Sequence, residues 1–227
     1  MKTIAERLKS ACETVKRSAL TANRPPKEVQ LLAVSKTKPV SDIVQAYEAG
    51  HRLFGENYVQ EGIEKVKALA NLTEIEWHFI GPLQSNKTRL VAENFDWVQS
   101  VDRLKIAQRL NDQRSAHKKL NVCIQVNIDN EESKAGVKPE ELDELAAQIR
   151  LLPNLTLRGL MAIPAAAQTN SQQHCSFQKM HKLFNEIKKN DSNIDTLSMG
   201  MSGDLHSAIA NGATIVRLGT AIFGART

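Results

Sequence analysis

The 227-residue sequence has few cysteines, few aromatic residues and no long apolar runs. Its three cysteines, Cys12, Cys123 and Cys175, are odd in number and far apart, which argues against a disulfide framework and for a reducing compartment. No apolar run approaches the roughly 20 residues that a membrane-spanning helix needs, and the charged N-terminal segment does not resemble a signal peptide. We therefore expect a cytoplasmic protein that is neither secreted nor inserted in a membrane.

Aromatic residues make up only 4% of the chain, although its formal net charge is +5. A basic protein can bind nucleic acid, but dedicated binders combine clustered cations with aromatic platforms for the bases. The densest basic cluster, His117-Lys118-Lys119, is short, and most other cations alternate with carboxylates, as they do between Glu61 and Lys67. Such alternation is typical of a solvated helix face. We therefore expect no nucleic-acid partner.

The chain does contain a repeating alternation of short apolar runs and amphipathic segments. The runs predict eight strands, which start near Val29, Arg52, Glu76, Trp97, Asn121, Thr156, Thr196 and Thr214. Helical spacing of apolar residues, as at Val59, Ile63 and Val66, separates most of them. A parallel sheet follows, since a parallel connection needs a crossover that holds a helix. Eight such units in 227 residues fit an α/β fold of the closed (β/α)8 TIM-barrel type, with an open doubly wound sheet as the alternative.

The first 22 residues carry one apolar stripe on a charged segment, which predicts an extra N-terminal helix that packs on the barrel. No linker or break in composition divides the chain, so we expect a single domain over residues 1–227. No exposed apolar stripe indicates an oligomer, and a monomer is compatible with the sequence. The polar stretch from Ala165 to Gln173 is a candidate for a mobile loop or lid.

Two segments near the C-terminus have the features of a phosphate-binding site. Ser202 and Gly203 are predicted to open a helix that runs to Asn211, and Gly219 and Thr220 open a short terminal turn. Each offers backbone N–H groups and a hydroxyl at a positive helix end, at the edge where barrels commonly bind phosphate. The alternative is that these residues only form turns and caps, and spacing alone does not separate the two interpretations.

Lys36 lies just past the first predicted strand, on the same side as the apolar Leu32 and Val34. Partial burial would lower the pKa of its amine and leave the neutral form that condenses with an aldehyde. The alternative is a structural lysine whose charge reaches solvent at the barrel rim.

Six segments of the chain closely resemble the pyridoxal phosphate homeostasis proteins of the YggS/PROSC type. They are LLAVSKTKP (31–39), FGENYVQE (54–61), WHFIGPLQSNK (77–87), RGLMAI (158–163), LSMGMSGD (197–204) and VRLGTAIFGAR (216–226). The match spans essentially the whole chain, and the 78–87 stretch is highly specific. The resemblance implies a fold-type III barrel, similar to the barrel domain of alanine racemase. It also implies that the protein binds pyridoxal 5′-phosphate and balances the free pool of this vitamin B6 cofactor without a strong catalytic activity.

By motif, the resemblance implies that Lys36 forms an internal aldimine, a Schiff base with the cofactor. It implies that Ser202, Gly219 and Thr220 hold the phosphate and that Arg217 faces the pyridine nitrogen. The sequence does not exclude a second lysine that also binds the cofactor.

Three more residues, Asn57, His78 and Met161, belong to family motifs at strand ends, and we expect them to line the pocket. We expect no catalytic residues. We also expect no metal site, because the histidines show no ligand spacing with cysteines or carboxylates.

An arginine at the ring nitrogen would limit the chemistry, because guanidinium only donates and so requires that nitrogen to be unprotonated. The ring is then a poor electron sink. Racemases of the related fold add groups from a second domain and a partner subunit, whereas one barrel is expected to use all the residues here. We therefore expect a carrier that stores the cofactor or passes it to apo forms of pyridoxal enzymes.

Two alternatives remain open. One is a pyridoxal-dependent racemase or lyase, with Tyr58 or His78 as a proton-transfer group. The other is a phosphate-ligand barrel in which Lys36 is structural.

Overall fold

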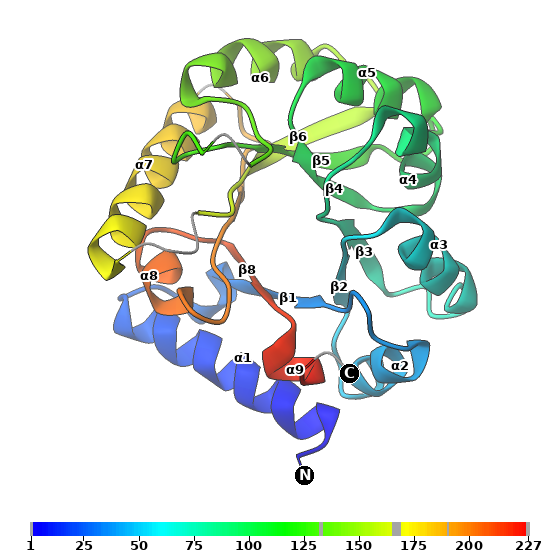
Figure 1. Cartoon of the computed structure of the whole chain (residues 1–227), viewed down its shortest axis with the longest axis vertical. Coiled ribbons are helices and arrows are strands. Elements are labelled where there is room, and N and C mark those ends of the chain that lie inside the picture. Colours follow the sequence, from blue (N-terminus) through cyan, green and yellow to red (C-terminus); the bar gives the residue numbers. More distant parts are fainter. Residues whose placement is uncertain (1, 132–133, 165–168, 190, 226–227) are drawn as a thin grey trace.

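The computed structural model describes residues 2–131, 134–164, 169–189 and 191–225. Within these ranges, parallel strands β1 to β8 close into a barrel in chain order (Figure 1). The strands are β1 (Gln30–Val34), β2 (Leu53–Glu56), β3 (Glu76–Phe79), β4 (Trp97–Val101), β5 (Leu120–Gln125), β6 (Leu155–Met161), β7 (Thr196–Ser198) and β8 (Ile215–Leu218). The barrel prediction is confirmed and the open-sheet alternative is wrong, because β8 pairs with β1 from Gln30↔Ile215 to Ala33↔Leu218.

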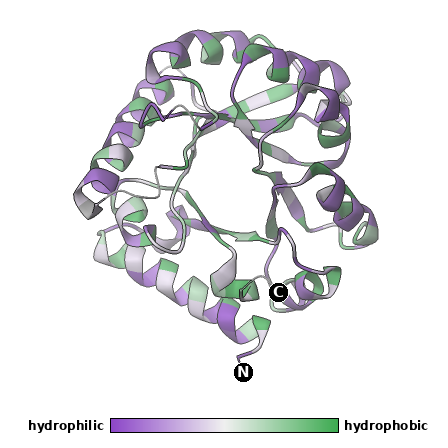
Figure 2. Cartoon of the chain, viewed as in Figure 1, coloured by the Kyte–Doolittle hydropathy of each residue, from purple (hydrophilic) through white to green (hydrophobic). Residues whose placement is uncertain are grey.

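Helices form the outer layer of the barrel, with their apolar faces turned toward the strands (Figure 2). They are α1 (Ile4–Thr21), α2 (Val40–Glu48), α3 (Val59–Ala68), α4 (Thr88–Asn94), α5 (Leu104–Gln113), α6 (Leu142–Arg150), α7 (Asn170–Lys188), α8 (Leu205–Ala210) and α9 (Thr220–Phe223). Three short 3₁₀ turns, Pro26–Glu28, Ser85–Lys87 and Pro139–Glu141, precede β1, α4 and α6. None of the described helices combines the length and the apolar character needed to span a membrane.

The N-terminal helix α1 packs on the part of the outer ring where α8 and α9 are short. It begins with a capping box: Thr3 Oγ1 accepts the Glu6 N–H at 3.1 Å, and Glu6 Oε2 accepts the Thr3 N–H at 2.8 Å. Its apolar stripe, including Leu8 and Val15, is buried. Arg7 Nε donates to Ile222 O at 2.7 Å, which joins the helix to α9.

The polar stretch predicted as a loop from Ala165 to Gln173 is helical in its second half. Thr169 caps α7, because its hydroxyl accepts the Gln172 N–H at 3.3 Å while Gln172 Oε1 accepts the Thr169 N–H at 2.9 Å. This capping box converts polar residues into a first helical turn. The remaining residues of the predicted lid, 165–168, lie outside the described residues.

The barrel interior is partly apolar and partly polar. Two small apolar clusters lie apart from the main core: Leu32, Ile80 and Ile215 in one, and Trp97, Cys123 and Met161 in the other. Four buried polar side chains contact one another across strands β3, β4, β7 and β8: His78, Gln99, Ser198 and Arg217. Because barrel interiors are usually filled by bulky aliphatic residues, this polar group needs an explanation beyond packing.

Candidate functional site

The predicted phosphate residues meet at one edge of the barrel, where β7 and β8 end. Gly219 caps α9, whose first N–H groups have no acceptor inside the helix. Ser202 lies in the preceding connection, and it lines a cavity of about 230 Å³ together with Leu218 and Ala221. Residues of α1 also line this cavity, whereas Gly219 and Thr220 do not, so Ser202 lies near the residues that flank the Gly219–Thr220 turn. The roles of Ser202, Gly219 and Thr220 in phosphate binding stay predictions.

The helix predicted to open at Ser202 begins three residues later, at Leu205, so its predicted N-terminal boundary is wrong. Asp204 causes the difference. Its Oδ1 accepts the Met201 N–H at 2.5 Å and its own N–H donates to Met201 O at 3.2 Å, which closes a turn over residues 201–204. Ser202 is exposed in this turn.

Lys36 lies in a tight turn directly after β1, and it is half-buried. Lys38 N–H donates to Ser35 O at 3.1 Å, and Thr37 has a φ of 62°. The left-handed conformation is unusual for a β-branched residue and costs on the order of 1–3 kcal/mol. The turn lies close to the predicted phosphate segment, because a Cβ on Gly219 would be 3.1 Å from Val34 O.

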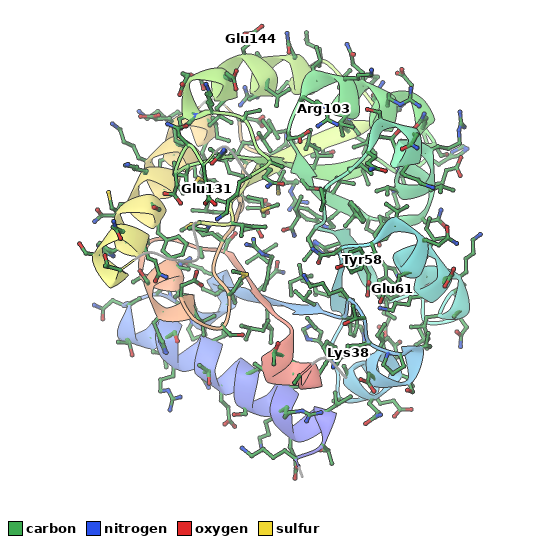
Figure 3. All side chains as sticks on the ribbon, viewed as in Figure 1. Lys38, Tyr58, Glu61, Arg103, Glu131 and Glu144 are labelled. Atoms are coloured by element: carbon green, nitrogen blue, oxygen red, sulfur yellow. The ribbon has the colours of Figure 1, made fainter. Side chains whose placement is uncertain are left out.

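Both neighbours of Lys36, Ser35 and Thr37, form hydrogen bonds with a buried ion cluster. It consists of Lys65 on α3 with Glu56 and Glu61, and we call it the Lys65 triad. Lys65 Nζ donates to Glu56 Oε1 at 2.9 Å, to Glu61 Oε1 at 2.6 Å and to Ser35 O at 2.7 Å. Ser35 Oγ donates to Glu56 Oε1 at 2.6 Å, and Thr37 N–H donates to Glu61 Oε1 at 2.5 Å. Figure 3 labels Glu61 and Lys38 in the same part of the barrel rim.

Within the Lys65 triad, the Glu56 carboxylate lies in an environment that disfavours its charge. Both Lys65 and Glu56 are buried, at 4% and 0% exposure. Burial raises the pKa of the Glu56 carboxyl, and the charge of Lys65 and the Ser35 hydroxyl oppose that rise. Glu56 Oε2 is buried without a hydrogen-bond partner among the described residues. A group with this environment is sensitive to the loss of its lysine.

Arg217 is buried in β8 at 5% exposure. Its NH1 donates to Ser198 O at 2.9 Å and to Ser198 Oγ at 2.8 Å, and its NH2 donates to Ala162 O at 2.8 Å. These three hydrogen bonds occupy three of the five N–H donors of the guanidinium. Burial lowers the pKa of Arg217 to about 10, a fall that the Asp204 carboxylate opposes, so the side chain stays charged near neutral pH.

A line of hydrogen bonds runs from Arg217 through the barrel interior to Glu76. Ser198 Oγ donates to Gln99 Oε1 at 2.6 Å, Gln99 Nε2 donates to His78 Nδ1 at 2.9 Å, and His78 Nε2 lies 2.9 Å from Glu76 Oε1. Because the amide nitrogen only donates, Nδ1 accepts and Nε2 carries the proton. The bond from His78 lowers the pKa of Glu76. In each of these hydrogen bonds the donor therefore lies on the Arg217 side and the acceptor on the side of the Glu76 carboxylate.

The three residues expected to line the pocket differ in placement. His78 is fully buried in the interior line and stacks on Trp97, with ring centroids 5.1 Å apart. Met161 is buried at the end of β6. Asn57 follows β2 and is half-buried, and its Oδ1 is buried without a hydrogen-bond partner among the described residues. Of the three, Asn57 offers an unsatisfied polar atom to a ligand.

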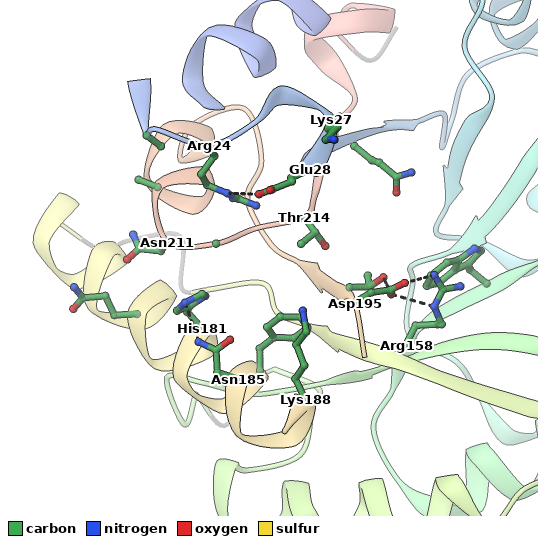
Figure 4. A pocket seen from close by; sticks show the side chains of 18 of the residues that line it. Arg24, Lys27, Glu28, Arg158, His181, Asn185, Lys188, Asp195, Asn211 and Thr214 are labelled. Carbon is green, nitrogen blue, oxygen red and sulfur yellow. Dashed lines mark hydrogen bonds and ion pairs between the residues drawn. The ribbon is translucent and has the colours of Figure 1, made fainter. Parts of the chain in front are cut away.

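A second cavity, of about 1110 Å³, lies at the opposite end of the barrel (Figure 4). Residues at the start of strands line it, and none of the predicted site residues is among them. Its charges largely pair with one another, as Figure 4 shows for Arg24 with Glu28 at 3.6 Å and Arg158 with Asp195 at 2.5 Å. Despite its size, this cavity does not match the predicted site. Among the described residues, no three His, Cys, Asp or Glu side chains cluster as metal ligands would.

The chain matches the family model for the alanine racemase N-terminal domain over residues 11–227. A curated relative from Pasteurella multocida, named pyridoxal phosphate homeostasis protein, is 57% identical over 228 residues, which cover 99% of this chain and 98% of the relative. PipY of Synechococcus elongatus, solved without and with bound PLP, superposes with TM-scores of 0.86 and 0.82 at 39% and 38% identity. Both alignments cover 98% of this chain and 100% of PipY.

An alanine racemase from Corynebacterium glutamicum shares the fold. Its TM-score is 0.67 at 15% identity, and the alignment covers 96% of this chain and 61% of the racemase.

Proposed function

This chain belongs to the pyridoxal phosphate homeostasis protein family, and we propose that it binds pyridoxal 5′-phosphate reversibly at the C-terminal end of its barrel. The observation that carries the proposal is the position of the Lys36 turn. Lys36 follows β1 directly, and the last residue of that strand, Val34, lies beside Gly219, where α9 starts. In this role the protein stores the cofactor and releases it to apo forms of pyridoxal enzymes.

The described residues fit such a ligand. Two N–H bonds of Arg217 and the Oδ1 atom of Asn57 have no partner among the described residues, although both side chains are at least half-buried. The start of α9 suits a phosphate dianion, because free backbone N–H groups and the helix dipole both favour negative charge. A cation, a hydroxyl-bearing helix start and an amine thus occur at one barrel edge.

When bound, the cofactor supplies an aldehyde, which condenses with a primary amine to form a C=N bond and release one water molecule. In our proposal Lys36 Nζ provides that amine. Ser202, Gly219 and Thr220 hold the phosphate, and Arg217 donates to the ring nitrogen. The three cysteines are free thiols, which supports a cytoplasmic location.

We propose further that the protein turns over no amino acid. An arginine donor keeps the ring nitrogen unprotonated, which removes most of the electron withdrawal that carbanion chemistry needs. The two candidate proton-transfer groups give little support to catalysis. Tyr58 is 52% exposed, and His78 is committed to Gln99 and Glu76.

Deuterium exchange tests this absence of turnover. We expect the loaded protein to exchange the α-proton of amino acids in deuterated water no faster than free cofactor does. Exchange is followed by proton NMR over a panel of amino acids, with an established racemase as the positive control. Exchange at catalytic rates would favour the racemase or lyase alternative.

A comparison of three ligands tests the binding mode. We expect pyridoxal 5′-phosphate to bind most tightly, with about tenfold or greater losses for pyridoxal, which lacks the phosphate, because charge-assisted hydrogen bonds are lost. Pyridoxine 5′-phosphate, which lacks the aldehyde, should bind without the visible absorption of the covalent adduct. Equilibrium dialysis gives the affinities. Equal affinity for pyridoxal with and without its phosphate would contradict the phosphate site.

The variants Ser202→Ala and Thr220→Val localise the phosphate site in the same assay. Both variants should lower the affinity for pyridoxal 5′-phosphate and leave the affinity for pyridoxal unchanged.

A further inference from the structure

On the basis of the function proposed above, we propose that the Lys65 triad is a positioning device for Lys36. The triad fixes the turn that carries Lys36 and thereby sets how fast this lysine reacts with the cofactor. Lys65, Glu56 and Glu61 act through the backbone on either side of Lys36, and they are positioning residues rather than catalytic ones.

The contacts of the triad converge on the two neighbours of Lys36. Ser35 is held at its carbonyl by Lys65 Nζ, at 2.7 Å, and at its hydroxyl by Glu56 Oε1, at 2.6 Å. Thr37 is held at its N–H by Glu61 Oε1, at 2.5 Å. Lys65 joins the two carboxylates, so the residues before and after Lys36 are tied to one cluster.

The conformation of the Thr37 backbone depends on these hydrogen bonds. Its φ of 62° is a conformation that β-branched residues rarely adopt, and such strain persists where the surroundings over-determine it. The hydrogen bond from Thr37 N–H to Glu61 and the bond from Lys65 to Ser35 O supply that constraint. Without them we expect Thr37 to relax, which would change the direction in which Lys36 leaves the turn.

Two observations argue that the triad does more than fill space. First, the Ser35, Glu56 and Glu61 acceptors use all three N–H bonds of a lysine ammonium, so Lys65 is not itself the reactive amine. Second, well-packed apolar residues often replace a buried ion cluster at no cost in stability. Lys65 lies on the buried face of α3 with Gly62 and Ile63, where apolar residues in place of the whole triad would serve packing.

The test separates reaction from binding. Lys65→Met and Glu61→Ala are compared with Lys67→Met, a matched control on the same helix whose side chain is exposed. Stopped-flow absorbance follows the rate at which the covalent adduct forms after pyridoxal 5′-phosphate is added. Equilibrium dialysis gives the affinity for pyridoxine 5′-phosphate, which occupies the site but cannot react. All measurements are made well below the unfolding temperature of each variant.

We expect adduct formation to slow by about tenfold in Lys65→Met and Glu61→Ala, because small misplacements of a reacting group are costly. The affinity for pyridoxine 5′-phosphate should stay within about twofold, as expected for a change that affects orientation more than binding. Lys67→Met should match the wild type in both assays. Adding Thr37→Gly to Glu61→Ala should recover part of the rate, because glycine adopts positive φ without strain.

Adduct formation at the wild-type rate in Glu61→Ala and Lys65→Met would overturn the proposal, since the triad would then be structural only. A parallel loss of rate and of pyridoxine 5′-phosphate affinity would also overturn it. If Lys65→Met does not fold, Glu61→Ala and its Thr37→Gly combination decide the question, because Glu61 is 28% exposed and its loss is less damaging. A failure of the proposed function can be told apart from a failure of this proposal, because the wild type itself would then form no adduct.

Discussion

Replacing Lys65 by methionine is expected to lower the free energy of unfolding by about 3–5 kcal/mol at pH 8, the usual cost of removing one partner from a buried ion pair. The variant leaves the Glu56 carboxylate buried, with the Ser35 hydroxyl as its remaining donor among the described residues. Glu61 retains its bond from the Thr37 N–H. The loss therefore arises mainly from one desolvated charge at Glu56.

The loss in free energy of unfolding should depend on pH, in a direction set by the ionisation of Glu56. Burial already raises the pKa of this group above its ordinary value of 4.5, and removing Lys65 takes away the largest opposing effect. A carboxyl whose folded-state pKa is raised destabilises the fold once the unfolded state ionises, because ionisation is less favourable in the folded state. Its penalty is absent below the unfolded-state pKa, grows as pH rises from that value to the folded-state pKa, and is complete above it. The difference between Lys65→Met and the wild type should therefore be smaller at pH 5 than at pH 8.

Urea unfolding at the two pH values measures this difference. Lys67→Met serves as the control and should change stability by less than about 0.5 kcal/mol, as exposed substitutions usually do. Adding Glu56→Gln to Lys65→Met should recover part of the loss at pH 8, because the buried charge is removed. An equal loss at both pH values would show that Glu56 does not carry the effect.

Replacing Lys36 by alanine is expected to abolish the visible absorption of the covalent adduct. Affinity for pyridoxal 5′-phosphate should fall by at least about tenfold, which corresponds to ~1.4 kcal/mol. Residual binding should persist through the phosphate and the ring, because Ser202, Gly219 and Arg217 are unchanged. Spectrophotometric titration and equilibrium dialysis measure the two effects separately.

Lys38→Ala is the matched control for this variant, because Lys38 belongs to the same turn. Lys38 Nζ donates to Ala225 O at 2.6 Å, so its amine is already engaged. We expect this control to keep the absorption and the affinity of the wild type. If Lys36→Ala keeps the wild-type absorption and occupancy, the adduct forms on another lysine.

The barrel could be predicted from the sequence because its signals are local. Each predicted strand start agrees with the structure to within one residue, from Val29 against Gln30 to Thr214 against Ile215. Short apolar runs separated by helical periodicity specify parallel crossovers. The helix boundary at Ser202 was wrong because the Asp204 turn competes with helix formation. The capping box from Thr169 to Gln172 was readable in the sequence, but the polar composition around it favoured a loop.

The residues around Lys36 and Arg217 could be predicted only in part. The motifs pointed to both side chains, but their supporting partners come from other elements. Lys65 lies on α3, and Ser198 and Gln99 lie on β7 and β4. A lysine on the buried face of α3, among Gly62, Ile63 and Leu69, was the one sequence signal of the triad. The direction of the hydrogen bonds from Arg217 to Glu76 depends on side-chain geometry that no spacing encodes.

In the proposed function, this barrel holds pyridoxal 5′-phosphate through Lys36. Borohydride reduction of the loaded wild-type protein, followed by proteolysis and mass spectrometry, tests it most directly, because reduction makes the C=N bond permanent. We expect one modified peptide, containing residues 31–39, with the added mass on Lys36. An adduct on Lys38, Lys65 or any other lysine, with Lys36 unmodified, would contradict the claim.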